Sequence, residues 1–162
     1  MPIKRMKKTT GHSLHVLHTH EVSASSAEDG LSEAPTKESQ GGIATARALA
    51  SIWSATVVDT DGVRLLDDGT IADATRPQTE GQPVFAAPPP FARWGTGFQL
   101  HWPRARTFLG PCSFGHDRLG GQVSFADARF HVGFGYITNF LEGAADGRSA
   151  AGIEALRRTM EP

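Results

Sequence analysis

A sharp change of composition at Gly41-Gly42 constrains the fold of this chain more than any other feature. The first 40 of its 162 residues are polar, rich in Ser, Glu, Thr and His, and show neither a helical nor a strand period. So few large apolar groups cannot offset the entropy lost when a backbone becomes ordered. We therefore expect residues 1–42 to be a disordered, His-rich tail and residues 43–162 to form a single domain.

Two helices are expected directly after this boundary. Apolar side chains recur at helical spacing over residues 43–58, and Thr45 can accept a hydrogen bond from an amide of the first turn. The Asp61-Gly62 pair predicts a turn. Asp67 or Asp68 is then expected to cap a second, shorter helix.

The rest of the chain indicates strands followed by one more helix. A proline-rich loop is expected over residues 78–90, and bulky side chains then alternate with small ones over residues 94–100, which predicts a strand. Two further strands are expected over residues 122–126 and 132–139, and a helix over about 149–160. This order predicts an α+β domain in which antiparallel strands pack against helices.

Charge and cysteine usage exclude several classes of protein. The formal net charge is −1, and the one basic cluster lies at the extreme N-terminus, so we expect no nucleic-acid partner. Cys112 is the single cysteine, which excludes an internal disulfide and a multi-cysteine zinc site. No apolar run is long enough to span a bilayer, and histidines interrupt the N-terminal stretch where a signal peptide would be continuous. We expect a cytoplasmic protein without a membrane partner.

Several short sequence segments after residue 42, in their order along the chain, resemble serine β-lactamases, penicillin-binding-protein-like hydrolases and related esterases. They occur within Ile43–Ala50, Asp61–Leu66, Trp94–Phe98, Phe114–Asp117, Gly120–Asp127 and Gly133–Asn139. The resemblance implies the C-terminal part of the β-lactamase/transpeptidase-like fold, so residues 43–162 would be a partial β-lactamase-related domain. It also implies hydrolysis of a small acyl ester or lactam through a serine acyl-enzyme in complete relatives, with no cofactor and no metal.

The resemblance implies three motifs around one cleft, and this sequence contains a remnant of one. No serine is followed three places later by lysine, and the single tyrosine, Tyr136, does not begin a Tyr-x-Asn motif. We therefore assign no catalytic residue and expect a truncated or degenerate member that is inactive alone. The third motif corresponds to His116, Asp117 and Arg118, where the family has glycine at the position of Arg118. Trp94 and Phe98 are expected to line the cleft.

Three other hypotheses remain open. Cys112, Ser113, His116 and Asp117 lie within six residues and could suggest a nucleophilic site, although such groups usually converge from distant parts of a chain. The retained groove could instead serve a non-catalytic ligand- or protein-binding module, with Arg118 as its cation. A metal-binding role of the histidines in the tail is the third.

The expected sheet also predicts a property of the isolated chain. With three strands and three helices, it would leave one apolar face partly uncovered and one edge unpaired. Such an edge is a template for pairing with another chain. Self-association through the exposed edge is therefore expected.

Overall fold

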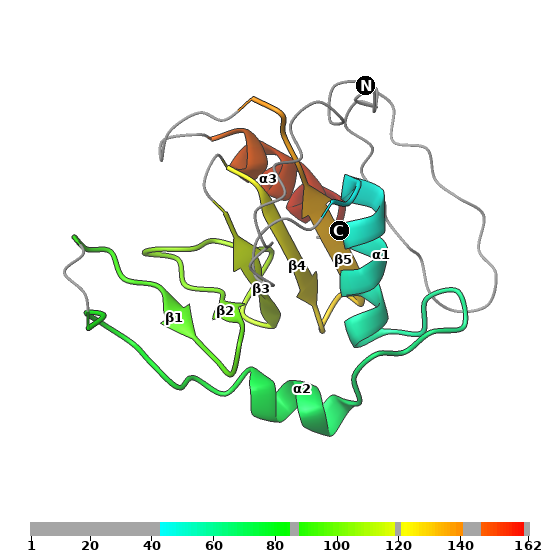
Figure 1. Cartoon of the computed structure of the whole chain (residues 1–162), viewed down its shortest axis with the longest axis horizontal. Coiled ribbons are helices and arrows are strands. Elements are labelled where there is room, and N and C mark those ends of the chain that lie inside the picture. Colours follow the sequence, from blue (N-terminus) through cyan, green and yellow to red (C-terminus); the bar gives the residue numbers. More distant parts are fainter. Residues whose placement is uncertain (1–42, 85–87, 119–120, 141–146, 161–162) are drawn as a thin grey trace, which may run out of the picture.

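The computed structural model describes residues 43–84, 88–118, 121–140 and 147–160. Neighbouring strands pair antiparallel, and the order across the sheet follows the order along the chain. The expected class, helices packed on an antiparallel sheet, is confirmed (Figure 1). The elements are α1 (Ala46–Val57), α2 (Asp68–Ala74), β1 (Arg93–Trp94), β2 (Gln99–Leu100), β3 (Ser113–Asp117), β4 (Val123–Asp127), β5 (Val132–Tyr136) and α3 (Arg148–Met160).

The first two helices begin where the sequence predicts. The Thr45 hydroxyl accepts the Ala48 N–H at 3.1 Å, which satisfies one unpaired amide of the first turn of α1. Of the two candidate caps for α2, the structure selects Asp67, whose carboxylate accepts the Thr70 N–H at 2.7 Å. The turn between the helices places Asp61 and Gly62 at positive φ.

The prediction of a single strand over residues 94–100 is wrong. Two short strands, β1 and β2, form a hairpin there, with Arg93 opposite Leu100 and Trp94 opposite Gln99. The Gly95 N–H donates to the Phe98 carbonyl at 2.9 Å, and Gly97 adopts a φ of +81°. Alternating glycines produce the period of a strand in the sequence, but here they form the turn, because glycine adopts positive φ without a steric penalty.

Within the described part of the chain the sheet therefore has five strands and not the expected three. β3 is the central strand and pairs with β2 on one side and along its whole length with β4 on the other. Its sequence, Ser-Phe-Gly-His-Asp, has one large apolar residue and so lacks the apolar alternation by which strands are recognised.

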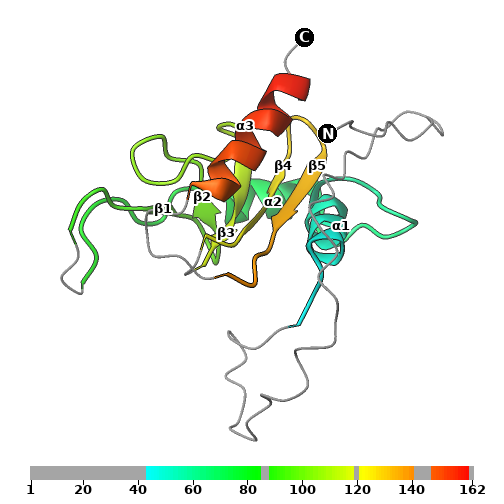
Figure 2. The ribbon, with the colours of Figure 1, turned by 90° about the horizontal axis from the view of Figure 1, so that it is seen from above.

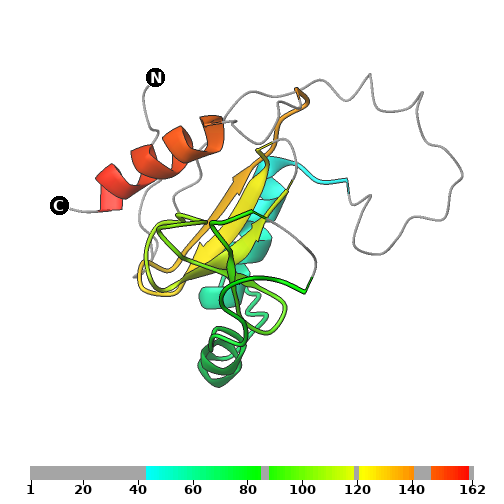
Figure 3. The same ribbon diagram turned by 90° about the vertical axis from the view of Figure 1, so that its left-hand side faces the viewer.

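Helices cover both faces of the sheet, so the predicted uncovered apolar face is also wrong (Figure 3). On one face α3 packs Ile153 and Leu156 over a stack of Phe108, Phe125 and Phe134, whose successive ring centroids are 5.0 and 5.1 Å apart. Figure 2 shows α3 crossing this face. The opposite face packs against α1 and α2 through a second core. Its buried members are Val57, Val58, Ile71, Leu100, Phe114 and Ala126.

Two glycines let α1 lie directly on β5. A Cβ at Gly133 would be 2.1 Å from the Ala50 carbonyl oxygen, and one at Gly135 would be 2.6 Å from that of Ala46. Val132 and Phe134 alternate with these glycines and face the core on the α3 side. The pattern Val-Gly-Phe-Gly-Tyr thus makes β5 flat on one face and bulky on the other.

Several expectations concern residues that the structure does not describe. The disordered tail expected over residues 1–42 lies outside the described residues. Within the described sheet β5 is an end strand, and self-association through that edge stays a prediction. None of the described helices has the length and apolar character needed to cross a membrane.

Candidate functional site

The C-terminal end of β3 brings together the residues that the third motif predicts. His116 and Asp117 are the last two residues of the strand, and Arg118 follows directly. The Arg118 N–H donates to the Gln122 carbonyl at 2.8 Å, so the backbone pairing with the start of β4 continues one residue past the strand. The backbone of His116 and Asp117 pairs with Ser124 and Val123 of β4, whereas β2 pairs with the two residues before them. Pairing with β4 therefore positions these side chains at the end of the strand.

The His116 imidazole is exposed and lies beside an aromatic ring. Its centroid is 5.4 Å from that of Trp94, at an interplanar angle of 62°. Its Nδ1 is in hydrogen-bonding contact with the carbonyl oxygen of Asp117. Because a carbonyl can only accept, a hydrogen bond here requires the proton on Nδ1. In the neutral ring this leaves the lone pair of Nε2 available to accept a hydrogen bond.

The Asp117 carboxylate does not orient this imidazole. It forms an ion pair with the Arg106 guanidinium, and the Asp117 N–H donates to the Gln99 side-chain oxygen at 3.0 Å. Both charged side chains are about three-quarters buried, and the Nε of Arg106 is buried without a hydrogen-bond partner in the described structure. This arrangement holds the loop before β3 against the end of the strand. Nothing in the sequence pattern pointed to Gln99 or Arg106, because both contacts join residues distant along the chain.

Although the side chain is exposed, partial desolvation of its ring lowers the pKa of His116 below its ordinary value of 6.5, and the guanidinium groups of Arg118 and Arg106 lower the pKa further. The ring is therefore predominantly neutral at pH 7. Since the unfolded chain keeps the higher pKa, it binds the proton more readily than the folded protein. Above pH 6.5 the ring is neutral in both states, and its contribution to the free energy of unfolding is at its maximum. This contribution decreases as the pH falls through 6.5 towards the folded pKa, because the unfolded chain takes up the proton first.

This charge effect predicts the result of an NMR titration. The Cε1–H resonance of His116 is expected to titrate with a pKa below 6.5, and Arg118→Gln should raise that pKa because one nearby positive charge is removed. Arg47→Gln, on the exposed side of α1, is the control and should leave the pKa unchanged. A His116 pKa at or above 6.5 in the unmodified chain would contradict the predicted environment.

The two aromatic residues expected in the cleft occupy different places. Trp94 is half-buried beside His116, at the candidate site. Phe98 lies across the hairpin turn and packs in the core on the α1 side, with ring centroids 5.8 Å from Trp53 and 5.1 Å from Phe114. The hairpin that replaces the expected strand is the reason for their separation.

The short cluster before His116 does not form a nucleophilic site. Ser113 is 2% exposed, and its hydroxyl donates to the buried Asp127 carboxylate at 2.6 Å. Cys112 is an exposed free thiol. The described residues contain no group of three or more His, Cys, Asp or Glu side chains that could hold a metal ion. The histidines of the tail are not among them.

Comparisons with known proteins give matches in structure. No protein-family profile and no curated protein sequence matches this chain. EstA from Arthrobacter nitroguajacolicus Rue61a is 28% identical with a TM-score of 0.63, and the match covers 72% of this chain and 32% of EstA. A penicillin-binding protein homologue from Caulobacter crescentus is 33% identical, with the same TM-score and the same coverages. A family VIII carboxylesterase is 28% identical with a TM-score of 0.56, and the match covers 68% of this chain and 30% of the enzyme.

The described sheet, with helices on both faces, is thus part of the β-lactamase/transpeptidase-like fold, which is the fold of the β-lactamase-like serine hydrolases. More particularly, the chain is similar to the esterases and the penicillin-binding protein homologue of that class. It spans about a third of the length of these proteins. The resemblance inferred from the sequence is confirmed at this level.

Proposed function

We propose that this chain forms the sheet wall of the substrate cleft of a β-lactamase-like serine hydrolase that acts on an ester or a β-lactam. The observation that supports this function most directly is the structural match, at 28 to 33% identity, over about 70% of the chain. The match is accompanied by a polar cluster at the end of β3, where the resemblance expects the third motif. His116, Asp117 and Arg118 form this cluster.

In this proposal His116 contacts the substrate and Asp117 is a positioning residue. The neutral imidazole presents Nε2 as an acceptor, while its Nδ1 is turned towards the Asp117 carbonyl. The ion pair with Arg106 holds the end of β3, and Trp94 supplies an apolar surface for an acyl group beside the ring. These groups bind and orient a substrate, but they do not attack it.

The attacking groups are missing from these 162 residues. Acyl transfer in this class needs a serine activated by a lysine one helical turn away, and no Ser-x-x-Lys is present. Removing the nucleophile of a catalytic unit lowers the rate by a factor on the order of 10⁴ to 10⁶. The 162-residue chain is therefore a binding wall without acylation chemistry of its own.

This function predicts that the purified chain binds substrates and does not turn them over. We expect no hydrolysis of a chromogenic cephalosporin or of a short-chain nitrophenyl ester, and no labelling of any serine by a fluorophosphonate probe. In NMR spectra the same compounds should shift the Trp94 indole and His116 ring signals, and leave the signal of the core residue Trp53 unchanged. Stoichiometric labelling of a serine would contradict the missing acylation chemistry. Unchanged Trp94 and His116 signals at millimolar ligand would contradict the proposed cleft.

A further inference from the structure

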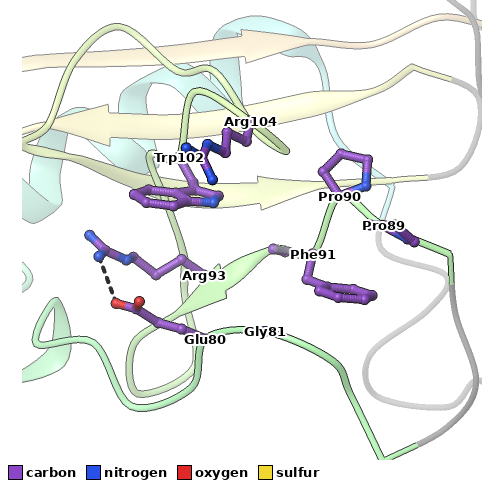
Figure 4. A pocket seen from close by; sticks show the side chains of 9 residues that line it. Glu80, Gly81, Pro89, Pro90, Phe91, Arg93, Trp102 and Arg104 are labelled. Carbon is purple, nitrogen blue, oxygen red and sulfur yellow. Dashed lines mark ion pairs between the residues drawn. The ribbon is translucent and has the colours of Figure 1, made fainter.

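A separate pocket of about 290 Å³ lies beside β1, between the chain that leads into this strand and the loop that follows β2 (Figure 4). Figure 4 shows Trp102 on one side of the pocket and Phe91 with Pro90 on the other. The arginines Arg93 and Arg104 and the carboxylate of Glu80 supply its charges. The pocket thus combines flat apolar walls with an excess of positive charge.

One wall is fixed before any ligand arrives. The Arg93 guanidinium lies over the Trp102 ring, 4.5 Å from its centroid, and Nη2 pairs with the Glu80 carboxylate at 2.6 Å. Both contacts restrict the rotamer of Arg93, and the Trp102 backbone pairs with Arg106 across a tight loop. Fixed side chains lose little entropy on binding, which favours a small ligand.

Arg104 carries a positive charge that the Glu80 carboxylate, paired with Arg93, does not neutralise. Its side chain lines the pocket next to Trp102 (Figure 4). Among the residues that the structure describes, it forms no hydrogen bond or ion pair. Glu80 offsets the charge of Arg93, so one positive charge remains at the pocket. A guanidinium binds a carboxylate through two parallel hydrogen bonds when no internal acid occupies it.

This pocket is distinct from the cluster at the end of β3. Successive side chains of a strand point to opposite sides, and the two residues of β1 follow this rule. Trp94 contacts His116, whereas Arg93 contacts Trp102 and Glu80. A ligand held by Arg93 and Arg104 would therefore occupy a second site.

We propose that this pocket binds a small monocarboxylate with a flat apolar body, such as an aromatic acid. The volume is at the lower end of the range for small-molecule sites, which selects a ligand of roughly one ring. Trp102 and Phe91 provide aromatic surfaces for the ring, and Arg104 binds the carboxylate. The inference goes beyond the proposed hydrolase wall and does not depend on it.

The indole N–H signals of the three tryptophans provide the test. Benzoate is the probe and benzamide its neutral counterpart of the same shape. Benzoate should shift the Trp102 signal in a saturable way and leave Trp53 and Trp94 unchanged, and benzamide should bind at least tenfold more weakly. Trp102→Phe identifies the signal.

Variants of exposed residues distinguish a specific binding site from nonspecific electrostatic attraction of anions. Arg104→Gln should weaken benzoate at least tenfold, while Arg47→Gln on α1 removes the same charge elsewhere and should change nothing. Glu80→Gln should strengthen binding a few-fold, because a like charge leaves the pocket. Equal binding of benzoate and benzamide, or binding unaffected by Arg104→Gln, would overturn the proposal. A benzoate shift at Trp94 in place of Trp102 would overturn it as well.

Discussion

Gly133→Ala will destabilise the protein by about 3 kcal/mol, near the upper end of the usual cost of overpacking a core. The added Cβ would lie 2.1 Å from the Ala50 carbonyl oxygen and 2.3 Å from the Ser54 amide nitrogen. Both are backbone atoms of α1, so no side-chain rotation relieves the contact. The helix must move away from β5, and part of the core between α1 and the sheet is lost with it. Urea denaturation measures the change in the free energy of unfolding.

The matched control is the same substitution in α3. A Cβ at Gly152 would meet the Phe134 ring at 3.4 Å, an ordinary contact with a side chain, and the position is inside a helix. Alanine is favoured over glycine there, so Gly152→Ala should stabilise the protein by about 0.5 to 1 kcal/mol. If Gly133→Ala cost less than about 1 kcal/mol, the close packing of α1 on β5 would be wrong.

Asp127→Ala is expected to cost about 3 kcal/mol, because one buried hydroxyl and two partly buried amides lose their acceptor. Asp127 is 1% exposed at the end of β4. Its carboxylate accepts the Ser113 hydroxyl at 2.6 Å and the N–H groups of Arg129 and Phe130 at 2.9 and 3.0 Å. One side chain thus joins the start of β3 to the turn between β4 and β5. Without it, the Ser113 hydroxyl lacks its buried acceptor and the turn loses two hydrogen bonds.

Asp127→Asn separates the loss of acceptors from the loss of charge. The amide keeps one oxygen for the two backbone N–H groups, and its nitrogen can donate to the Ser113 hydroxyl, so we expect a cost of about 1 kcal/mol. Thermal and urea unfolding of both variants at pH 7 give the comparison. Equal destabilisation by Asn and Ala would show that charge, and not the hydrogen bonds to the turn, is the important property.

The local elements of this protein could be predicted from its sequence. The periods of α1, α3, β4 and β5 are set by residues a few positions apart, and the Thr45 and Asp67 caps act within one turn. Such local patterns can be recognised without knowledge of the rest of the chain. The resemblance to the family could also be recognised, because the order of short sequence segments along the chain is a property of the sequence.

Other features were decided by the tertiary structure alone. β3 becomes a strand because β2 and β4 pair with it on both sides, although its own residues carry no strand period. The glycines of residues 95–97 form a turn because the hairpin closes around them. Asp117 pairs with Arg106, and Arg93 with Trp102 and Glu80, across segments that fold back on one another. Pairing between distant segments depends on where the chain returns in space, which no local pattern encodes. The sequence therefore determined the helices, the Thr45 cap, the family likeness and the residues of the third motif. The choice of Asp67 as the second cap, the central strand, the second core and the contacts within both candidate sites arise only when the sheet is assembled.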